Sequence, residues 1–198
     1  MLLDIIILPP AEIRKAIGRL SGEISRRHSL AWKVDDKKLI PHISLYHLNC
    51  SPQRIPEITK YLKILASETR PVRLAIEKGS YDGPYFGMNV SMSNLLSDLH
   101  HAVVYGVKHL RSFGMPLFFL PTKKLQKKYY KNFGVFKILK YFSPHITIGM
   151  VKNTGDLPKI VKLVRLPKFA TFNGKQLALA EIDKRWQVTK ILKTFKLQ

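Results

Sequence analysis

The chain has almost no cysteine and no long apolar run. Its 198 residues include one cysteine, Cys50, so no disulfide can form within the chain, and the sequence suits a reducing compartment. No apolar run approaches the ~18–20 residues that a membrane span needs. The opening MLLDIIILPP has an acid at position 4 and no basic region before it, which favours a first strand over a signal peptide. Cysteine and histidine do not cluster at metal-ligand spacing. We therefore expect a cytoplasmic protein with no membrane segment, no metal and no cofactor.

Acidic residues are also few. The chain has 13 Asp and Glu against 34 Lys and Arg, which gives a formal net charge of +21 at pH 7. Such an imbalance says little about fold, but it concentrates polyanions near the surface. A solvated basic surface would explain it without any partner. RNA becomes the better explanation if the same chain carries the chemistry to act on phosphodiesters.

One five-residue pattern occurs twice. Residues 41–45 read PHISL and residues 144–148 read PHITI, so both follow the order proline, histidine, apolar, hydroxyl, apolar. From the amino-acid composition, only about 0.02 copies of this pattern are expected by chance. Both copies lie in runs that are typical of β-strands.

Alternate side chains of a strand point to opposite faces, so His42 shares a face with Ser44, and His145 shares one with Thr147. Each strand would present an imidazole and a hydroxyl roughly 6.5–7 Å apart. Two such strands facing one cleft supply two groups for proton transfer and two hydrogen-bond donors. The alternative is a pair of core strands whose histidines are merely satisfied by hydrogen bonds. A repeated pattern favours the catalytic interpretation.

The two motifs resemble the paired His-x-[Thr/Ser]-apolar motifs of the 2H phosphoesterase superfamily, which includes 2′-5′ RNA ligases and cyclic phosphodiesterases. The resemblance implies an α+β fold of two pseudo-symmetric lobes, whose antiparallel sheets flank a central cleft with helices on the outside. It also implies that His42 and His145 are the catalytic acid and base, and that Ser44 and Thr147 bind phosphate. A nucleophilic serine is the competing interpretation.

The predicted elements agree with one two-lobed domain over residues 1–198. We expect strands at 2–8, 39–48, 72–78, 85–92, 169–173 and 177–183, a motif strand in the run SPHITIGMV at 143–151, and a final strand or strand pair at 186–197. Helices are expected at 11–28, 51–67, 93–111 and 156–163. Residues 32–38 are expected to be a polar connection. Two hairpins are expected, one across GSYDGP and one across Asn173-Gly174. Residues 39–92 and 141–183 then each hold a motif strand, a helix and two strands.

A basic and aromatic segment covers residues 114–143. Its thirty residues include seven lysines and no acids, interleaved with aromatic residues: Phe118, Phe119, Tyr129, Tyr130, Phe133, Phe136, Tyr141 and Phe142. This mixture fits contact with nucleic acid, and Lys123, Lys124, Lys127 and Lys128 are its candidate phosphate ligands. The alternative is an amphipathic helix whose aromatic residues pack inward. The two interpretations are compatible.

The sequence departs from the family pattern after the second motif. Many members have a basic residue there, whereas Gly149-Met150-Val151 precede Lys152. Lys152 is a candidate substitute, although strand alternation points it away from His145 unless the strand has ended. Tyr46 alternates onto the His42 face and could stack on a base or ribose, or pack at the cleft edge. His47 falls on the opposite face and is expected to be structural.

These features predict a monomeric, metal-independent phosphodiesterase that acts on RNA or nucleotides with a cyclic or internal phosphodiester. Opening of 2′,3′-cyclic phosphates is the favoured reaction, and 2′-5′ ligation or RNA trimming are alternatives within the family. An RNA-binding module with weak or vestigial catalysis is an alternative of another class, and a basic structural protein of a ribonucleoprotein is a third.

Overall fold

Two antiparallel sheets form the centre of the molecule in the computed structural model, which describes residues 1–112, 114–116, 121–166 and 170–198. The strands are β1 (Leu2–Ile7), β2 (Leu30–Lys33), β3 (Ile43–Asn49), β4 (Val72–Asp82), β5 (Tyr85–Val90), β6 (His145–Val151), β7 (Thr171–Gly174), β8 (Gln176–Ile182) and β9 (Val188–Lys196). One sheet has the order β3-β1-β8-β9 and the other has the order β2-β6-β5-β4-β7.

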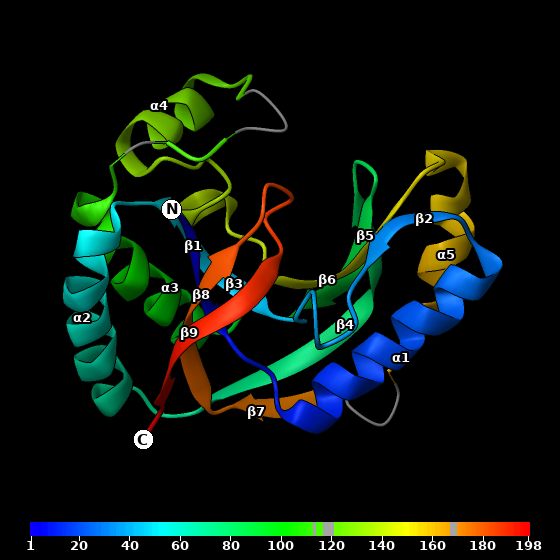
Figure 1. Ribbon diagram of the computed structural model, residues 1–198, viewed down its shortest axis with the longest axis horizontal. Helices are drawn as coiled ribbons and strands as arrows, with labels where there is room; N and C mark the ends of the chain where they lie inside the picture. Colours follow the sequence, from blue (N-terminus) through cyan, green and yellow to red (C-terminus); the bar gives the residue numbers. More distant parts are fainter. Residues whose placement is uncertain (113, 117–120, 167–169) are drawn as a thin grey trace.

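The helices lie on the outside of the two sheets (Figure 1). They are α1 (Ala11–Arg27), α2 (Ile55–Glu68), α3 (Asn94–Val107), α4 (Lys124–Phe133) and α5 (Leu157–Leu163). Helices α2 and α3 pack on the four-stranded sheet, whereas α1 and α5 pack on the five-stranded sheet. The α+β plan inferred from the two motifs is confirmed. No helix in the described part of the chain is both long and apolar enough to cross a membrane.

Strand β1 holds the four-stranded sheet together. Its sequence LLDIII is buried from Leu3 to Ile7, and β3 pairs with it along one edge and β8 along the other. A continuous apolar run is expected of a strand that is covered on both faces. The one polar residue in this run is Asp4, which is also fully buried.

The second predicted hairpin is wrong. Asn173-Gly174 does not join two paired strands, because β7 pairs with β4 in the five-stranded sheet and β8 pairs with β1 and β9 in the other. The turn chemistry is present, but the apolar run Leu177–Ala180 is fully buried in the centre of its sheet, which an isolated hairpin could not provide. Phe169, where this prediction begins, lies outside the described residues.

The predicted polar connection at 32–38 is also partly wrong, because Leu30–Lys33 forms the edge strand β2 beside β6. Trp32 is its one buried residue. An edge strand has one unpaired side and can be short and largely exposed. The alternation of apolar and polar residues in such a short strand is too brief to be recognised in the sequence.

Candidate active site

The two motif strands come from different sheets and meet at one cleft of about 510 Å³. His42 lies immediately before β3, and His145 is the first residue of β6. Ser44 and Thr147 follow on the same strands, and all four side chains line the cleft. The structure therefore brings the four motif residues together.

Both motif histidines make the same contact through Nδ1. His42 Nδ1 lies 2.7 Å from the Ile40 carbonyl oxygen, and His145 Nδ1 lies 2.8 Å from that of Ser143. A carbonyl oxygen can only accept, so each Nδ1 carries the hydrogen and donates it. In each case a proline lies between the two partners and restricts the backbone there. Whenever one of these rings is neutral, its lone pair is therefore on Nε2, and Nε2 is the nitrogen that takes up or gives a proton.

The environments of the two imidazoles differ. The His42 side chain is buried, and its Nε2 is 3.6 Å from Asp4 Oδ2. His145 is exposed within the cleft, and no described residue bonds its Nε2. Burial lowers the pKa of His42, against the opposing effect of the Asp4 carboxylate. Protein atoms crowd the cleft around His145 and lower its pKa as well, while its bond to the Ser143 carbonyl opposes this shift.

The two hydroxyls also have different partners. Ser44 Oγ donates to Asp4 Oδ2 at 2.6 Å, so its proton faces away from the cleft. Thr147 is half-buried and makes no side-chain hydrogen bond to a described residue. Its strand neighbour is Gly87, where a Cβ would lie 2.2 Å from the Ile146 carbonyl oxygen. This close approach of β5 and β6 requires glycine and fixes the position of Thr147.

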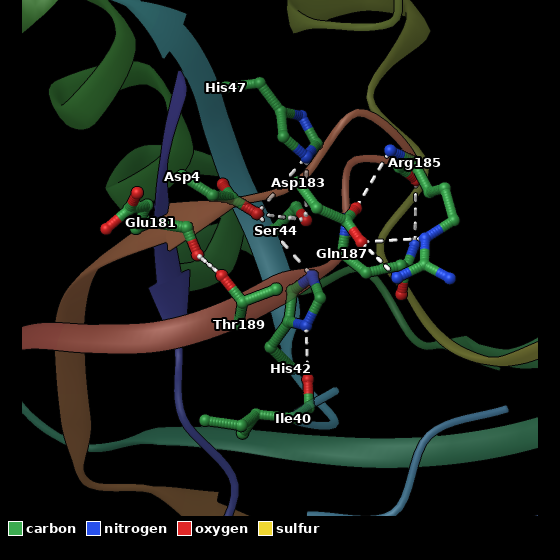
Figure 2. Close-up of polar contacts among 10 residues, drawn as sticks. All are labelled: Asp4, Ile40, His42, Ser44, His47, Glu181, Asp183, Arg185, Gln187 and Thr189. Atoms are coloured by element: carbon green, nitrogen blue, oxygen red, sulfur yellow. Dashed lines mark hydrogen bonds and ion pairs between the residues drawn. The ribbon is translucent and has the colours of Figure 1, made fainter. Parts of the chain in front are cut away.

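Two site residues, Asp4 and His47, are missing from the sequence prediction. His47 Nε2 lies 3.2 Å from Asp4 Oδ2 and 3.4 Å from Ser44 Oγ, and His47 lines the cleft (Figure 2). Strand alternation had placed His47 on the opposite face, which is wrong. A lone acid inside an apolar strand was the available signal for Asp4, because buried carboxylates need partners.

A β-bulge explains the misplacement of His47. The register of β1 with β3 pairs Ile5 with Tyr46 but Ile6 with Ser44, so Leu45 is an extra residue. One extra residue shifts the alternation and turns the following side chains to the other face. The bulge has a dedicated partner, because His100 Nδ1 donates to the Leu45 carbonyl oxygen at 2.9 Å.

His100 connects this bulge to the segment that precedes the second motif. Its Nε2 accepts from the Leu139 backbone N–H at 2.9 Å, and its ring stacks on Phe142 at a centroid distance of 3.8 Å. The ring donates from Nδ1 to Leu45 and accepts at Nε2 from Leu139, and only a neutral imidazole can do both. Burial lowers the pKa of His100 to about 4, against the bond to the Leu45 carbonyl.

We expect His100 to make the fold sensitive to acid. The folded-state pKa lies below the ordinary value, so the stabilisation is complete above about pH 6.5 and is lost as the pH falls towards 4. The free energy of unfolding should fall by on the order of 3 kcal/mol. In His100→Gln, the amide can still donate and accept hydrogen bonds. The difference between its free energies of unfolding in urea at pH 7.5 and pH 4.5 should therefore be smaller than in the wild type by about that amount. His101→Gln, on the same helix but exposed, is the control. An unchanged pH dependence in His100→Gln would contradict this assignment.

The remaining predicted site residues lie elsewhere. Tyr46 borders the cleft, but its ring is 1% exposed and its hydroxyl donates to the Phe133 carbonyl oxygen at 2.6 Å. It forms part of the wall and has no free face for stacking. Lys152 is exposed and is not among the cleft residues. The same holds for the four lysines at the start of α4: Lys123, Lys124, Lys127 and Lys128.

The basic and aromatic segment contributes to the site in its second half. Residues 135–138 and 141–143 line the cleft, whereas α4 itself does not. On α4, the rings of Tyr129 and Phe133 pack edge to face, and Tyr129 does the same with Tyr141. The amphipathic interpretation is therefore confirmed for α4. Phe118 and Phe119 lie outside the described residues.

The cleft is also lined by two cations that the sequence patterns did not single out. Lys137 is paired with Asp82, and Arg185 Nε donates to Asp183 Oδ2 at 2.7 Å. Both cations are about half exposed. Arg185 belongs to the turn between β8 and β9, which comes from the distant C-terminal part of the chain (Figure 2). Only the fold brings it to the motifs.

Comparison with known proteins concerns the family and the fold of the chain. The family model of the 2′-5′ RNA ligase superfamily matches residues 9–186. No curated protein sequence matches the chain. Among solved structures, the fold is similar to TT0787 of Thermus thermophilus, with a TM-score of 0.63 and 17% identity over 100% of this chain and 98% of that one. It is also similar to LigT of E. coli complexed with 3′-AMP, with a TM-score of 0.57 and 14% identity over 99% and 97% of the two chains. At these identities the likeness concerns the fold.

Proposed function

This chain belongs to the 2′-5′ RNA ligase superfamily, and from that premise we propose that it is a phosphodiesterase of RNA ends or small nucleotides that opens 2′,3′-cyclic phosphates. The observation that carries the proposal is the pair of imidazoles in one cleft, both with Nδ1 bonded to a carbonyl and Nε2 left for chemistry. One ring takes a proton from water while the other gives a proton to the leaving ribose oxygen. Neither step requires a metal.

The cleft cations are suited to hold the phosphate. Arg185 and Lys137 are now paired with acids, and both retain exposed surface at the cleft. A guanidinium matches the geometry of a phosphate, and charge-assisted bonds are stronger than neutral ones. We infer that Arg185 supplies the cation that the sequence lacks after its second motif, in place of Lys152.

A substrate panel tests the proposal. The protein is offered 2′,3′-cyclic mononucleotides, 2′-5′-linked dinucleotides and 3′-5′-linked oligonucleotides, with EDTA present throughout. We expect the cyclic mononucleotides to be opened and EDTA to have no effect. Consumption of only the 2′-5′ or 3′-5′ linkage would assign a ligase-type or trimming activity instead. Loss of turnover on chelation would contradict a metal-independent reaction.

A contact with longer RNA is a second proposal, which the exposed lysines of α4 favour. Replacing Lys123, Lys124, Lys127 and Lys128 by Gln should weaken oligonucleotide binding and flatten the log–log dependence of affinity on salt by up to about three units, because each phosphate on a single strand contributes about −0.7. Turnover of a cyclic mononucleotide should barely change, since none of the four lines the cleft.

The matched control for the α4 lysines removes the same charge from another surface. Lys60 and Lys63 on α2 and Lys193 and Lys196 on β9 are exposed and can be replaced by Gln together. If both quadruple variants flattened the salt dependence equally, binding would follow net charge and not a site at α4. If the α4 variant lost mononucleotide turnover as well, those lysines would belong to the catalytic machinery.

A further inference from the structure

One carboxylate oxygen lies behind the motif residues of β3. Asp4 Oδ2 accepts the hydrogen bond from Ser44 and lies 3.2 Å from His47 Nε2 and 3.6 Å from His42 Nε2 (Figure 2). Asp4 is fully buried, and the other residues of its strand are apolar. A carboxylate in such a place is costly unless its charge is compensated. The site is therefore built so that three side chains converge on one negative oxygen.

The two motif imidazoles face different groups through Nε2. Both nitrogens of His42 face acceptors, the Ile40 carbonyl at Nδ1 and the Asp4 carboxylate at Nε2. Only an imidazolium presents a hydrogen on both nitrogens. His145 donates from Nδ1 to the Ser143 carbonyl, but no described residue accepts or donates at its Nε2. A neutral ring suits that position.

We propose that Asp4 is a positioning residue that decides how the two histidines share their roles: it favours protonated His42 as the general acid and leaves His145 as the general base. This inference rests on the proposed phosphodiesterase function and adds the assignment of the two roles. At 3.6 Å the contact between Asp4 and His42 is longer than a hydrogen bond. The hydrogen on Nε2 thus remains available to a leaving group.

The reaction then has a defined direction. His145 Nε2 takes a proton from water, and the water oxygen bonds to phosphorus. The bond between phosphorus and one ribose oxygen breaks, and that oxygen receives the proton from His42 Nε2. The product is a ribose phosphate monoester, and exchange with solvent returns the proton from His145 to His42.

The charges around His42 come from three strands. Burial lowers the pKa of His42, and Asp4 on β1 is the charge that opposes this effect, with help from the Ile40 carbonyl. The other titratable groups that face the ring are His47 on β3 and His145 on β6, and both act against its protonation. Asp4 is therefore the one acid acting on this imidazole among the described residues.

The acid that acts on His145 has the weakest effect among the groups around this ring. The protein atoms that crowd the cleft around His145 lower the pKa of its ring, and His47 and Lys137 act in the same direction. Asp82 is the acid that favours its protonation, with the weakest effect, and it is itself paired with Lys137. The remaining charged residue that lines the cleft is Arg185, which is paired with Asp183 in the turn between β8 and β9.

The pH dependence of kcat/KM tests the assignment. Asp4→Asn removes the charge and keeps the shape. The high-pH limb, which reports loss of the acid's proton, should move to lower pH by about 1 unit, while the low-pH limb stays in place. Asp4→Ser removes the same charge with a smaller side chain and should give the same shift. Movement of the low-pH limb instead, or of neither limb, would overturn the proposal.

His47→Gln provides a control of opposite sign. His47 disfavours protonation of His42, so its removal should leave the high-pH limb in place or move it to higher pH. A general loosening of the cleft would shift the limb in the same direction in both variants. Equal downward shifts in Asp4→Asn and His47→Gln would therefore contradict a specific effect of the Asp4 charge.

A titration without substrate separates this inference from the proposed function. With ¹⁵N-labelled histidine, NMR follows the ring nitrogens of His42 and His145 as the pH changes. In Asp4→Asn the midpoint of His42 should fall, and that of His145 should not. If this shift occurs but no substrate of the panel is consumed, the proposed function is wrong and the effect of Asp4 stands. If substrate is consumed and the His42 midpoint is unchanged, the inference about Asp4 is wrong.

Discussion

His42→Ala and His145→Ala should each lower kcat/KM for a 2′,3′-cyclic nucleotide by about a hundred- to ten-thousandfold, which is the range for loss of a general acid or base. The two histidines act on one proton-transfer sequence, so the double variant should be little slower than either single variant. Steady-state kinetics on all three proteins measures this directly. A double variant that is slower by the product of the two losses would indicate independent roles.

The controls for these variants follow from their surroundings. His145 is exposed in the cleft, so its removal should leave thermal unfolding unchanged. His42 is buried, and His42→Asn keeps a hydrogen-bonding side chain there if alanine is destabilising. His109→Ala removes a histidine from an exposed position away from the cleft and should retain full activity.

Thr147→Val should slow turnover by roughly a hundred- to a thousandfold, the usual cost of removing one donor to a developing charge. Valine has nearly the same shape, and no described residue depends on the Thr147 hydroxyl. The loss should appear in kcat with little change in KM if the bond forms mainly in the transition state. A change in KM alone would mean that the hydroxyl binds substrate and transition state equally.

Ser44→Ala tests the other hydroxyl and the competing nucleophile interpretation. Ser44 Oγ already donates its hydrogen bond to Asp4, so Ser44→Ala also removes the closest hydrogen-bond donor of a buried carboxylate. We expect a slower but active enzyme. If Ser44→Ala were as inactive as His42→Ala, and a phosphoserine accumulated in the wild type, the serine would be the nucleophile.

The motif residues could be found from sequence because their signal is local. A strand period of two places His42 beside Ser44 whatever the rest of the chain does. His47 could not be placed in the same way, since one extra residue at Leu45 reverses every later position. That bulge depends on His100, more than fifty residues away, which no local pattern connects to it.

The other limits of sequence reasoning also concern long-range pairing. The turn at Asn173-Gly174 was recognised, but turn chemistry does not state which strands pair. Nothing in the sequence distinguishes Arg185 among the 34 Lys and Arg residues of the chain. Only the turn between β8 and β9 places it at the cleft. Asp4 was visible as an acid in an apolar strand, and only the pairing of β1 with β3 gives it a role.

Strands that are close in sequence belong to different sheets, and this affects how the molecule can fold. The pair β4 and β5 follows the first motif in sequence but joins the sheet of the second motif, while β8 returns to lie between β1 and β9. Neither half of the chain can therefore complete a sheet alone, and most pairings join residues far apart in sequence. Such topologies form slowly. During synthesis, the edge of β1 that pairs with β8 stays unpaired until β8 has been made. We expect this edge to be the place where nascent chains pair wrongly with one another.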